Sequence, residues 1–270
     1  MRSMAKSERI HDEVRIEYVA DGRVARLVME PGTNSLNTFE PRKVESMAAA
    51  VRDLDSVGCL VLYGESGFSA GADLAAIERT PQELRPARID TIAAASNRFI
   101  RAIRELPAPV IAAVSGVAAG GGLGFVLASD LVVMHAEAVL NTAYMRVGLT
   151  PDNATPFFLV NTVGPYKARE LLFDPKPITA SEAVDLGLAN DAVDVPESDF
   201  LAAVTDWATT LAEGPTEVYA RTKRLVDTTF EGSLDQHLER ERMAIKEVSD
   251  SDAFDEGLSA FLEKRAPEWG

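Results

Sequence analysis

The chain has 270 residues, of which 46% are hydrophobic and 26% are charged, and its formal net charge is −15. This composition is typical of a folded protein with a sizeable core. The acidic balance argues against nucleic-acid partners and anionic membrane surfaces, because both attract clustered lysine and arginine. The single cysteine, Cys59, lies in the apolar run CLVLY, so a disulfide framework is excluded and a buried thiol is expected.

The opening segment MRSMAKSERIHDEV has no apolar stretch that could form a signal peptide, and we expect a frayed end there in a cytoplasmic protein. Alternating runs at 14–19 and 24–30, joined by Ala-Asp-Gly, predict a β-hairpin. Apolar residues at helical spacing then predict a helix over about 39–54, and CLVLYG at 59–64 predicts a buried strand.

Helices and strands then alternate along the chain. A helix over about 88–105 precedes the strand PVIAAV at 109–114. The stretch 106–129 has no charge, but it is rich in alanine and glycine and begins with two prolines, so a buried strand followed by a buried helix explains it better than a membrane span. Further elements are expected at 131–134 (strand), 138–140 (strand) and 165–173 (helix). The alternation predicts an α/β core with largely parallel, buried strands.

From about residue 197 onward only helical patterns remain. Helices of this amphipathic kind cannot bury all their apolar faces alone, so we expect them to pack against the core or another subunit, which favours an oligomer. We therefore expect a core over 14–196 and a helical C-terminal region over 197–270.

Two glycine-rich segments are candidates for chemistry. GFSAGADL at 67–74 follows a strand, and its glycines permit a tight turn with exposed N–H groups, although a plain connecting loop is the alternative. In VAAGGGLGFVLASD at 117–130, the glycines at 120–122 lie where a helix should begin, at a cost of about 1 kcal/mol each relative to alanine. The cost suggests a close approach to the backbone, either by an anion or developing oxyanion or by a tightly packed helix.

Four segments, FSAGADL, PVIAAVSGVAAGGGLGFVLASDLVVM, RVGLTPDNATPFFLVNTVG and ITASEAVDLGLANDAV, occur in an order and spacing that resemble the crotonase (enoyl-CoA hydratase/isomerase) superfamily. NSLN at 34–37 is similar to that family's early Asn-Ala-Leu signature. The resemblance covers the chain from about residue 14. It implies a spiral core of repeated ββα units, a helical trimerisation region, a homotrimer or dimer of trimers, an acyl-CoA thioester substrate, and no cofactor or metal beyond the coenzyme A of that substrate.

The resemblance carries functional residues over to this chain. The backbone N–H groups of Ala72 and Gly121 would form the oxyanion hole that holds the thioester oxygen as an enolate develops. The expected CoA-binding residues are Ala70, Asp73 and Leu74, although Asp73 also suits a helix cap. Lys223 and Arg224 are candidates for contact with the CoA phosphates.

The reaction depends on the acids. At the positions of the two glutamates of family hydratases, this chain has Gly124 and Tyr144, so little classical hydratase activity is expected. Asp152 matches the carboxylate of GL-x-PD members, which resemble ring-1,2-epoxyphenylacetyl-CoA isomerase. One such base could move a proton from the α-carbon to the γ-carbon, and the apolar flank would raise its pKa. We expect an enoyl-CoA isomerase with Asp152 as acid/base.

Two alternatives stay open. Asp152 could act as a nucleophile, as in the similar 4-chlorobenzoyl-CoA dehalogenase, in a dehalogenase- or thioesterase-type hydrolysis. That chemistry also uses a histidine base and a tryptophan donor, at whose positions this chain has Asn97 and Tyr144, and the histidines at 11, 135 and 237 lie elsewhere. The chain could also be a catalytically poor acyl-CoA-binding subunit. In each case the expected pocket residues beside Asp152 are Asn97, Gly124 and Tyr144.

Overall fold

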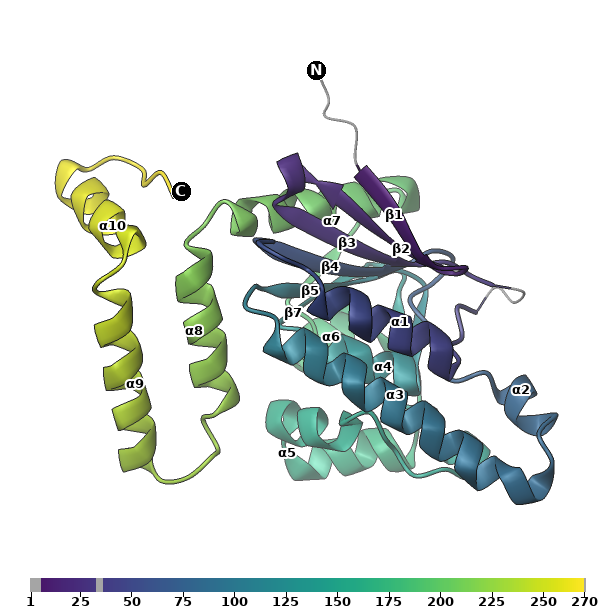
Figure 1. The fold of residues 1–270 in the computed structure, drawn as a ribbon. Helices are drawn as coiled ribbons and strands as arrows, with labels where there is room; N and C mark the ends of the chain where they lie inside the picture. Colours follow the sequence, from purple (N-terminus) through teal and green to yellow (C-terminus); the bar gives the residue numbers. More distant parts are fainter. Residues whose placement is uncertain (1–5, 33–35, 270) are drawn as a thin grey trace.

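The computed structural model describes residues 6–32 and 36–269. Its described part contains a seven-stranded sheet in the order β1-β2-β3-β4-β5-β7-β10 (Figure 1). The strands that run parallel from the middle of this sheet to one edge are β3 (Val24–Met29), β4 (Cys59–Gly64), β5 (Val110–Val114), β7 (Leu131–His135) and β10 (Asp191–Val193). The hairpin partner β2 (Val14–Val19) pairs antiparallel with β3, as the sequence predicts.

Residues 6–11 form strand β1 (Lys6–His11), antiparallel to β2, so the expectation of a frayed end is wrong for this segment. The strand lies at the edge of the sheet, and its described side chains from Ser7 to Arg9 are exposed. Backbone hydrogen bonding to β2 and an ion pair from Arg9 to Glu30 at 2.8 Å stabilise it in place of burial. An edge strand that buries little has no apolar periodicity to detect.

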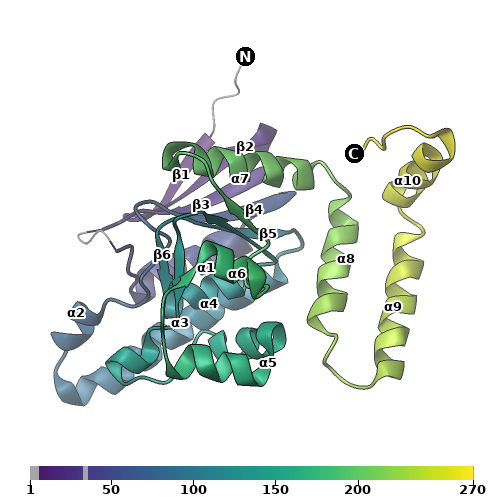
Figure 2. The same ribbon diagram turned by 180° about the vertical axis from the view of Figure 1, so that it is seen from behind.

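Helices cover both faces of the sheet. On one face lie α1 (Pro41–Arg52) and α3 (Arg85–Glu105), whose buried residues share a core with Leu60 and Leu62 of β4. On the other face lies α7 (Glu197–Ala212), which packs with Cys59 and Val61 (Figure 2). Both faces of β4 are thus buried, which explains its uninterrupted apolar sequence and confirms the buried thiol. Helix α7 therefore packs as part of the core. From the sequence, we expected all residues from 197 onward to belong to the helical C-terminal region.

A smaller three-stranded sheet in the described chain consists of β6 (Val117–Ala119), β8 (Val139–Asn141) and β9 (Ile178–Thr179). Three helices flank this part of the fold, α4 (Gly121–Leu127), α5 (Thr155–Phe173) and α6 (Ala180–Asp185), and the short α2 (Leu74–Glu78) follows the first glycine loop. Helix α5 starts ten residues before the expected 165–173, because the segment TPFFLVNTV is helical up to a break at Gly164, where φ is +74°. The uncharged segment 106–129 holds β5, β6 and α4, and among the described residues no helix is long and apolar enough to cross a bilayer.

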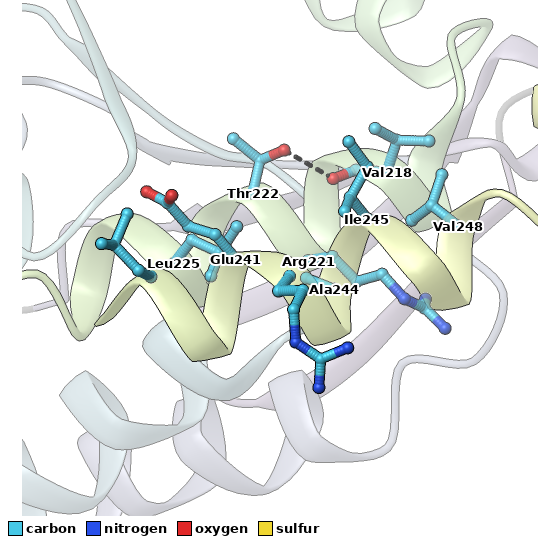
Figure 3. Close-up of a pocket in the computed structure, with 10 residues that line it drawn as sticks. Val218, Arg221, Thr222, Leu225, Glu241, Ala244, Ile245 and Val248 are labelled. Carbon is cyan, nitrogen blue, oxygen red and sulfur yellow. Dashed lines mark hydrogen bonds between the residues drawn. The ribbon is translucent and has the colours of Figure 1, made fainter. Parts of the chain in front are cut away.

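The last three helices, α8 (Thr216–Asp227), α9 (Leu234–Val248) and α10 (Asp252–Glu263), stand away from the sheet (Figures 1 and 2). Lys223 ties α8 to the core, since its Nζ lies 2.8 Å from Asp130 Oδ2 and donates to the Ile103 carbonyl at 2.8 Å. A hollow of about 550 Å³ lies between α8 and α9, lined mainly by aliphatic side chains such as Val218, Leu225 and Ile245 (Figure 3). This hollow contains none of the expected site residues.

Candidate functional site

The two glycine-rich loops meet through their backbones. A Cβ atom placed on Gly71 would lie 2.9 Å from the Gly121 nitrogen, and one on Gly122 would lie 2.5 Å from the Ser69 carbonyl oxygen. Gly71 also has a φ of +88°, which favours glycine. The close approach to the backbone at the glycines of 120–122, inferred from the sequence, is therefore confirmed. The backbone of the first glycine-rich loop makes part of this approach.

This contact leaves two N–H groups available. Around Ala72, the neighbouring groups are engaged: Phe39 N–H donates to the Gly71 carbonyl at 3.0 Å, and Gly71 N–H donates to Ser69 Oγ at 3.1 Å. Within the described chain, neither Ala72 N–H nor Gly121 N–H has a backbone acceptor outside its own helix or strand. Gly121 is the first residue of α4, where the N–H groups lack intrahelical partners. The two loops therefore present candidate donors for one oxygen atom.

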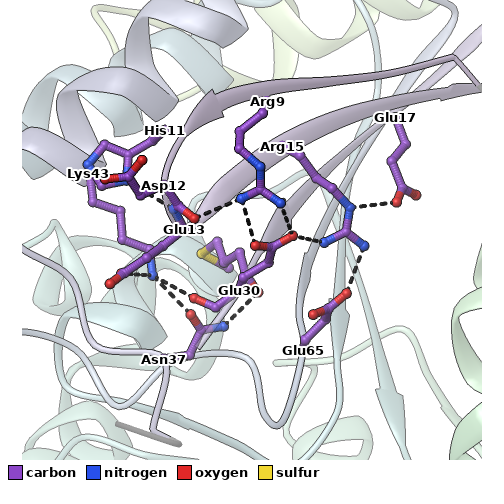
Figure 4. Close-up of polar contacts among 11 residues, drawn as sticks. Arg9, His11, Asp12, Glu13, Arg15, Glu17, Glu30, Asn37, Lys43 and Glu65 are labelled. Atoms are coloured by element: carbon purple, nitrogen blue, oxygen red, sulfur yellow. Dashed lines mark hydrogen bonds and ion pairs between the residues drawn. The ribbon is translucent and has the colours of Figure 1, made fainter. Parts of the chain in front are cut away.

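A buried polar cluster supports the first loop (Figure 4). The side-chain amide of Asn37 donates to the carbonyls of Gly67 and Phe68, both at 3.2 Å. The amine of Lys43, which is 2% exposed, donates to Asn37 Oδ1 and pairs with Glu13, each at 3.1 Å. Burial lowers the pKa of Lys43. Of the expected NSLN signature, Asn34 and Ser35 lie outside the described residues, and Asn37 serves as the anchor of the loop.

The candidate acid is held by a tyrosine. Tyr144 begins the 3₁₀ turn Tyr144–Val147 and is buried, and its hydroxyl donates to Asp152 Oδ1 at 2.8 Å. Burial raises the pKa of Asp152, while the hydrogen bond from Tyr144 opposes that rise. The pKa of Tyr144 is also raised, first by burial and then by the Asp152 charge, so the phenol stays neutral and remains a donor. The raised pKa of Asp152 agrees in direction and cause with the sequence-based prediction.

Replacing Tyr144 with Phe removes a hydrogen bond that stabilises the carboxylate form of Asp152. We expect the pKa of Asp152 to rise further, because only a backbone hydrogen bond then opposes the effect of burial, and the acid limb of the kcat/KM profile to move to higher pH. The measurement is a pH–rate profile of both proteins, with Tyr166→Phe, an exposed tyrosine on α5, as the matched control. An acid limb that stays in place or moves to lower pH would contradict the assigned hydrogen bond.

Asn153 is a site residue that the sequence analysis missed. It follows Asp152, is 3% exposed, and its Nδ2 donates to the Gly121 carbonyl at 3.1 Å. A Cβ atom on Gly124 would lie 2.4 Å from Asn153 Cβ, so Asn153 occupies the space into which a side chain at position 124 would point. In the sequence, Asn153 reads as an ordinary turn residue, and nothing local indicates its contact with residues some thirty positions earlier.

The remaining candidates are placed as follows. Asp73 caps α2, accepting from the Ala76 N–H at 2.9 Å, and Leu74 beside it is exposed. Ala70 donates its N–H to the Leu36 carbonyl at 2.9 Å. Asn97 lies on the exposed side of α3, and its side chain makes no hydrogen bond to another described residue, so no such bond joins it to Asp152.

The basic residues of α8 and the histidines lie in other places. The expectation that Lys223 meets CoA phosphates is wrong, because its amine is buried in an ion pair with Asp130. The ring of His135 bonds to the Val195 carbonyl at 2.8 Å, and His237 on α9 pairs with Glu241. His11 ends β1. Histidine-assisted hydrolysis at Asp152 therefore finds no partner at any of these three positions.

Comparison with known proteins agrees with this architecture. Residues 24–270 match the enoyl-CoA hydratase/isomerase family. The 1,2-epoxyphenylacetyl-CoA isomerase of Escherichia coli (strain K12) is 30% identical over 261 residues, which cover 95% of this chain and 98% of that protein. An enoyl-CoA hydratase structure from Polaromonas sp. JS666 has a TM-score of 0.82 at 29% identity, covering 94% of this chain and 99% of that one. One from Bacillus anthracis has a TM-score of 0.85 at 23% identity, covering 96% and 99%, and supports the fold.

The chain therefore belongs to the crotonase (enoyl-CoA hydratase/isomerase) family and has its α/β fold. Members of this family are enzymes that act on acyl-CoA thioesters.

Proposed function

We propose that the protein isomerises the double bond of an enoyl-CoA, with Asp152 as the acid/base and the N–H groups of Ala72 and Gly121 as the oxyanion hole. The observation that carries the proposal is the carboxylate of Asp152, which is partly buried, has a raised pKa and accepts a hydrogen bond from Tyr144 at one of its oxygens. Of the two positions at which family hydratases carry glutamates, one holds Tyr144, and the other is closed because Gly124 packs directly on Asn153. One base suits a proton shift, whereas hydration needs two groups.

In this mechanism Asp152 removes a proton from the α-carbon of a β,γ-enoyl-CoA. The electron pair moves onto the thioester oxygen, where the two backbone donors stabilise the resulting dienolate. The protonated Asp152 then returns the proton to the γ-carbon as the double bond moves between the α- and β-carbons. Substrate and product have the same composition, so the proposed proton shift balances without an oxidant, a reductant or a co-substrate. Each oxyanion donor contributes roughly 10²–10³ in rate by analogy with other such sites.

The test is a panel of acyl-CoA thioesters, assayed together for double-bond migration, hydration and release of CoA. We expect migration as the main reaction, with a deuteron from D₂O appearing at the α- or γ-carbon when the abstracted proton exchanges with solvent. A 3-hydroxyacyl-CoA or free CoA as the main product would contradict the proposal. A covalent acyl adduct on Asp152, detected by mass spectrometry during turnover, would instead establish the nucleophilic hydrolysis. Thioester binding without turnover of any acyl group would indicate a binding subunit.

We also propose that the helices α8–α10 form the contact between subunits of a homotrimer or of a dimer of trimers. The support is the exposed apolar side chains of this region, among them Phe230 in the connection between α8 and α9, and Leu234, Ile245, Phe261 and Leu262 on the helices. Apolar surface of this extent on helices that stand away from the core is typical of an interface. Sedimentation velocity measures the assembly directly.

A further inference from the structure

Asn153 lies between the candidate acid and the candidate oxyanion loop. Its backbone has a φ of +52°, a left-handed conformation that asparagine tolerates better than most residues. The side chain points back to α4, where Nδ2 donates to the Gly121 carbonyl at 3.1 Å. One buried side chain therefore joins the residue adjacent to Asp152 to the residue whose N–H is a proposed oxyanion donor.

The same side chain closes the space above two glycines. A Cβ atom on Gly121 would lie 2.6 Å from Asn153 Nδ2 and 2.7 Å from Phe39 Cζ, and one on Gly124 would lie 2.4 Å from Asn153 Cβ. Real Cβ atoms do not approach so closely, so a side chain at either position would displace Asn153. Gly121, Gly124 and Asn153 thus form one packed unit.

We propose that Asn153 is a positioning residue that sets the distance between the Asp152 carboxylate and the Gly121 N–H. This inference rests on the proposed roles of those two groups. The hydrogen bond runs from Asn153, the neighbour of Asp152, to Gly121, which carries the proposed oxyanion donor. Its loss therefore lets the acid and the donor move relative to each other. A misplacement of about 1 Å can reduce a rate roughly 10²-fold. Binding of the CoA portion does not depend on this bond, so the loss appears in kcat rather than in KM.

Packing and positioning are separated by a pair of variants. Asn153→Gly retains the left-handed backbone but removes both the side-chain volume and the donor, so we expect kcat to fall about 10²-fold with KM little changed, and Tm to fall. Asn153→Leu keeps a side chain of nearly the same shape and removes the donor. We expect this second variant to lose less Tm than Asn153→Gly, but to recover no kcat. Recovery of kcat together with Tm would show that Asn153 acts by packing alone and would overturn the proposal.

Asn153→Asp is the near-isosteric variant, and it keeps the inference testable if the glycine variant does not fold. An ionised carboxylate cannot donate to the Gly121 carbonyl, whereas a protonated one can. The titratable groups facing this position are Asp152 in the same turn and Tyr144, while Phe39 and the contacting glycines of α4 carry none. We expect the ratio of variant to wild-type kcat to rise from alkaline to mildly acidic pH. A ratio that is flat or falls toward acidic pH would overturn the proposal.

A spectroscopic measurement separates this inference from the proposed reaction. The absorption band of an unreactive conjugated aryl-CoA thioester moves to longer wavelength when donors polarise the thioester oxygen. We expect this shift with wild-type protein and a reduced shift with Asn153→Gly and with Asn153→Leu. If the wild type shifts the band but isomerises no enoyl-CoA, the proposed reaction fails and the reduced shift still supports Asn153 positioning. An equal shift in all variants, or none in the wild type, would overturn the positioning role.

Discussion

Replacing Asp152 with Asn should lower enoyl-CoA isomerisation by roughly 10³-fold, because the amide cannot accept the α-proton. The same change should raise Tm at neutral pH. Burial holds the pKa of Asp152 above its ordinary value in the folded protein, so the folded state disfavours the ionised form relative to the unfolded chain. The stability gain should therefore be full above the pKa of the folded-state carboxyl group and should shrink as pH falls through that pKa.

The measurements are initial rates and thermal unfolding curves across pH, with Asp185→Asn, an exposed carboxylate on α6, as the matched control. A lost activity together with an unchanged or higher Tm excludes misfolding as the cause. If Asp152→Asn keeps its rate within about tenfold of wild type, a general base contributing 10²–10⁴ is excluded and the acid/base role is wrong.

Replacing Lys43 with Met should lower the free energy of unfolding by about 3 kcal/mol. The methionine fills a similar volume but donates no hydrogen bond. The buried Oδ1 of Asn37 and the carboxylate of Glu13 would then lose the amine that contacts each of them at 3.1 Å (Figure 4). Because Asn37 anchors the loop carrying Ala72, the folded variant should also turn over substrate more slowly.

Urea unfolding at neutral pH measures this effect. Arg42→Met is the control, because Arg42 is the neighbouring cation on α1 and is exposed, so its replacement should change the free energy of unfolding by less than about 0.5 kcal/mol. A loss below about 1 kcal/mol for Lys43→Met would mean that water or a shifted side chain satisfies Asn37 and Glu13.

Sequence patterns predicted the helices and strands whose buried apolar residues form a continuous run or recur at regular spacing. The apolar run at 59–64 became β4, buried on both faces, and the helical spacing over 39–54 became α1. The edge strand β1 was missed, because a strand held by backbone hydrogen bonds and ion pairs has no apolar period. The start of α5 was missed because the turn-forming residues Pro151 to Asn153 directly precede it and Gly164 breaks it.

The candidate acid was found because the family resemblance points to Asp152 and because an isolated carboxylate in an uncharged segment is visible in the sequence. Its partner Tyr144 was placed in the pocket by the same resemblance, but the hydrogen bond between them appears only in the folded chain. Asn153 and Lys43 escaped the sequence analysis altogether. Their importance comes from contacts with distant segments, which no local period encodes.

The sequence by itself thus determined the class of fold, the glycine loops and the single acid, because amphipathic periods and local backbone preferences are properties of neighbouring residues. Only the tertiary structure decided why Gly121 and Gly124 must be small. It brings Asn153, Phe39 and Ser69 against the start of α4, so the glycines accommodate protein atoms and leave the Gly121 N–H available as a donor. That outcome depends on close packing between segments far apart in the chain, and packing of this kind is set by the three-dimensional fit of whole elements.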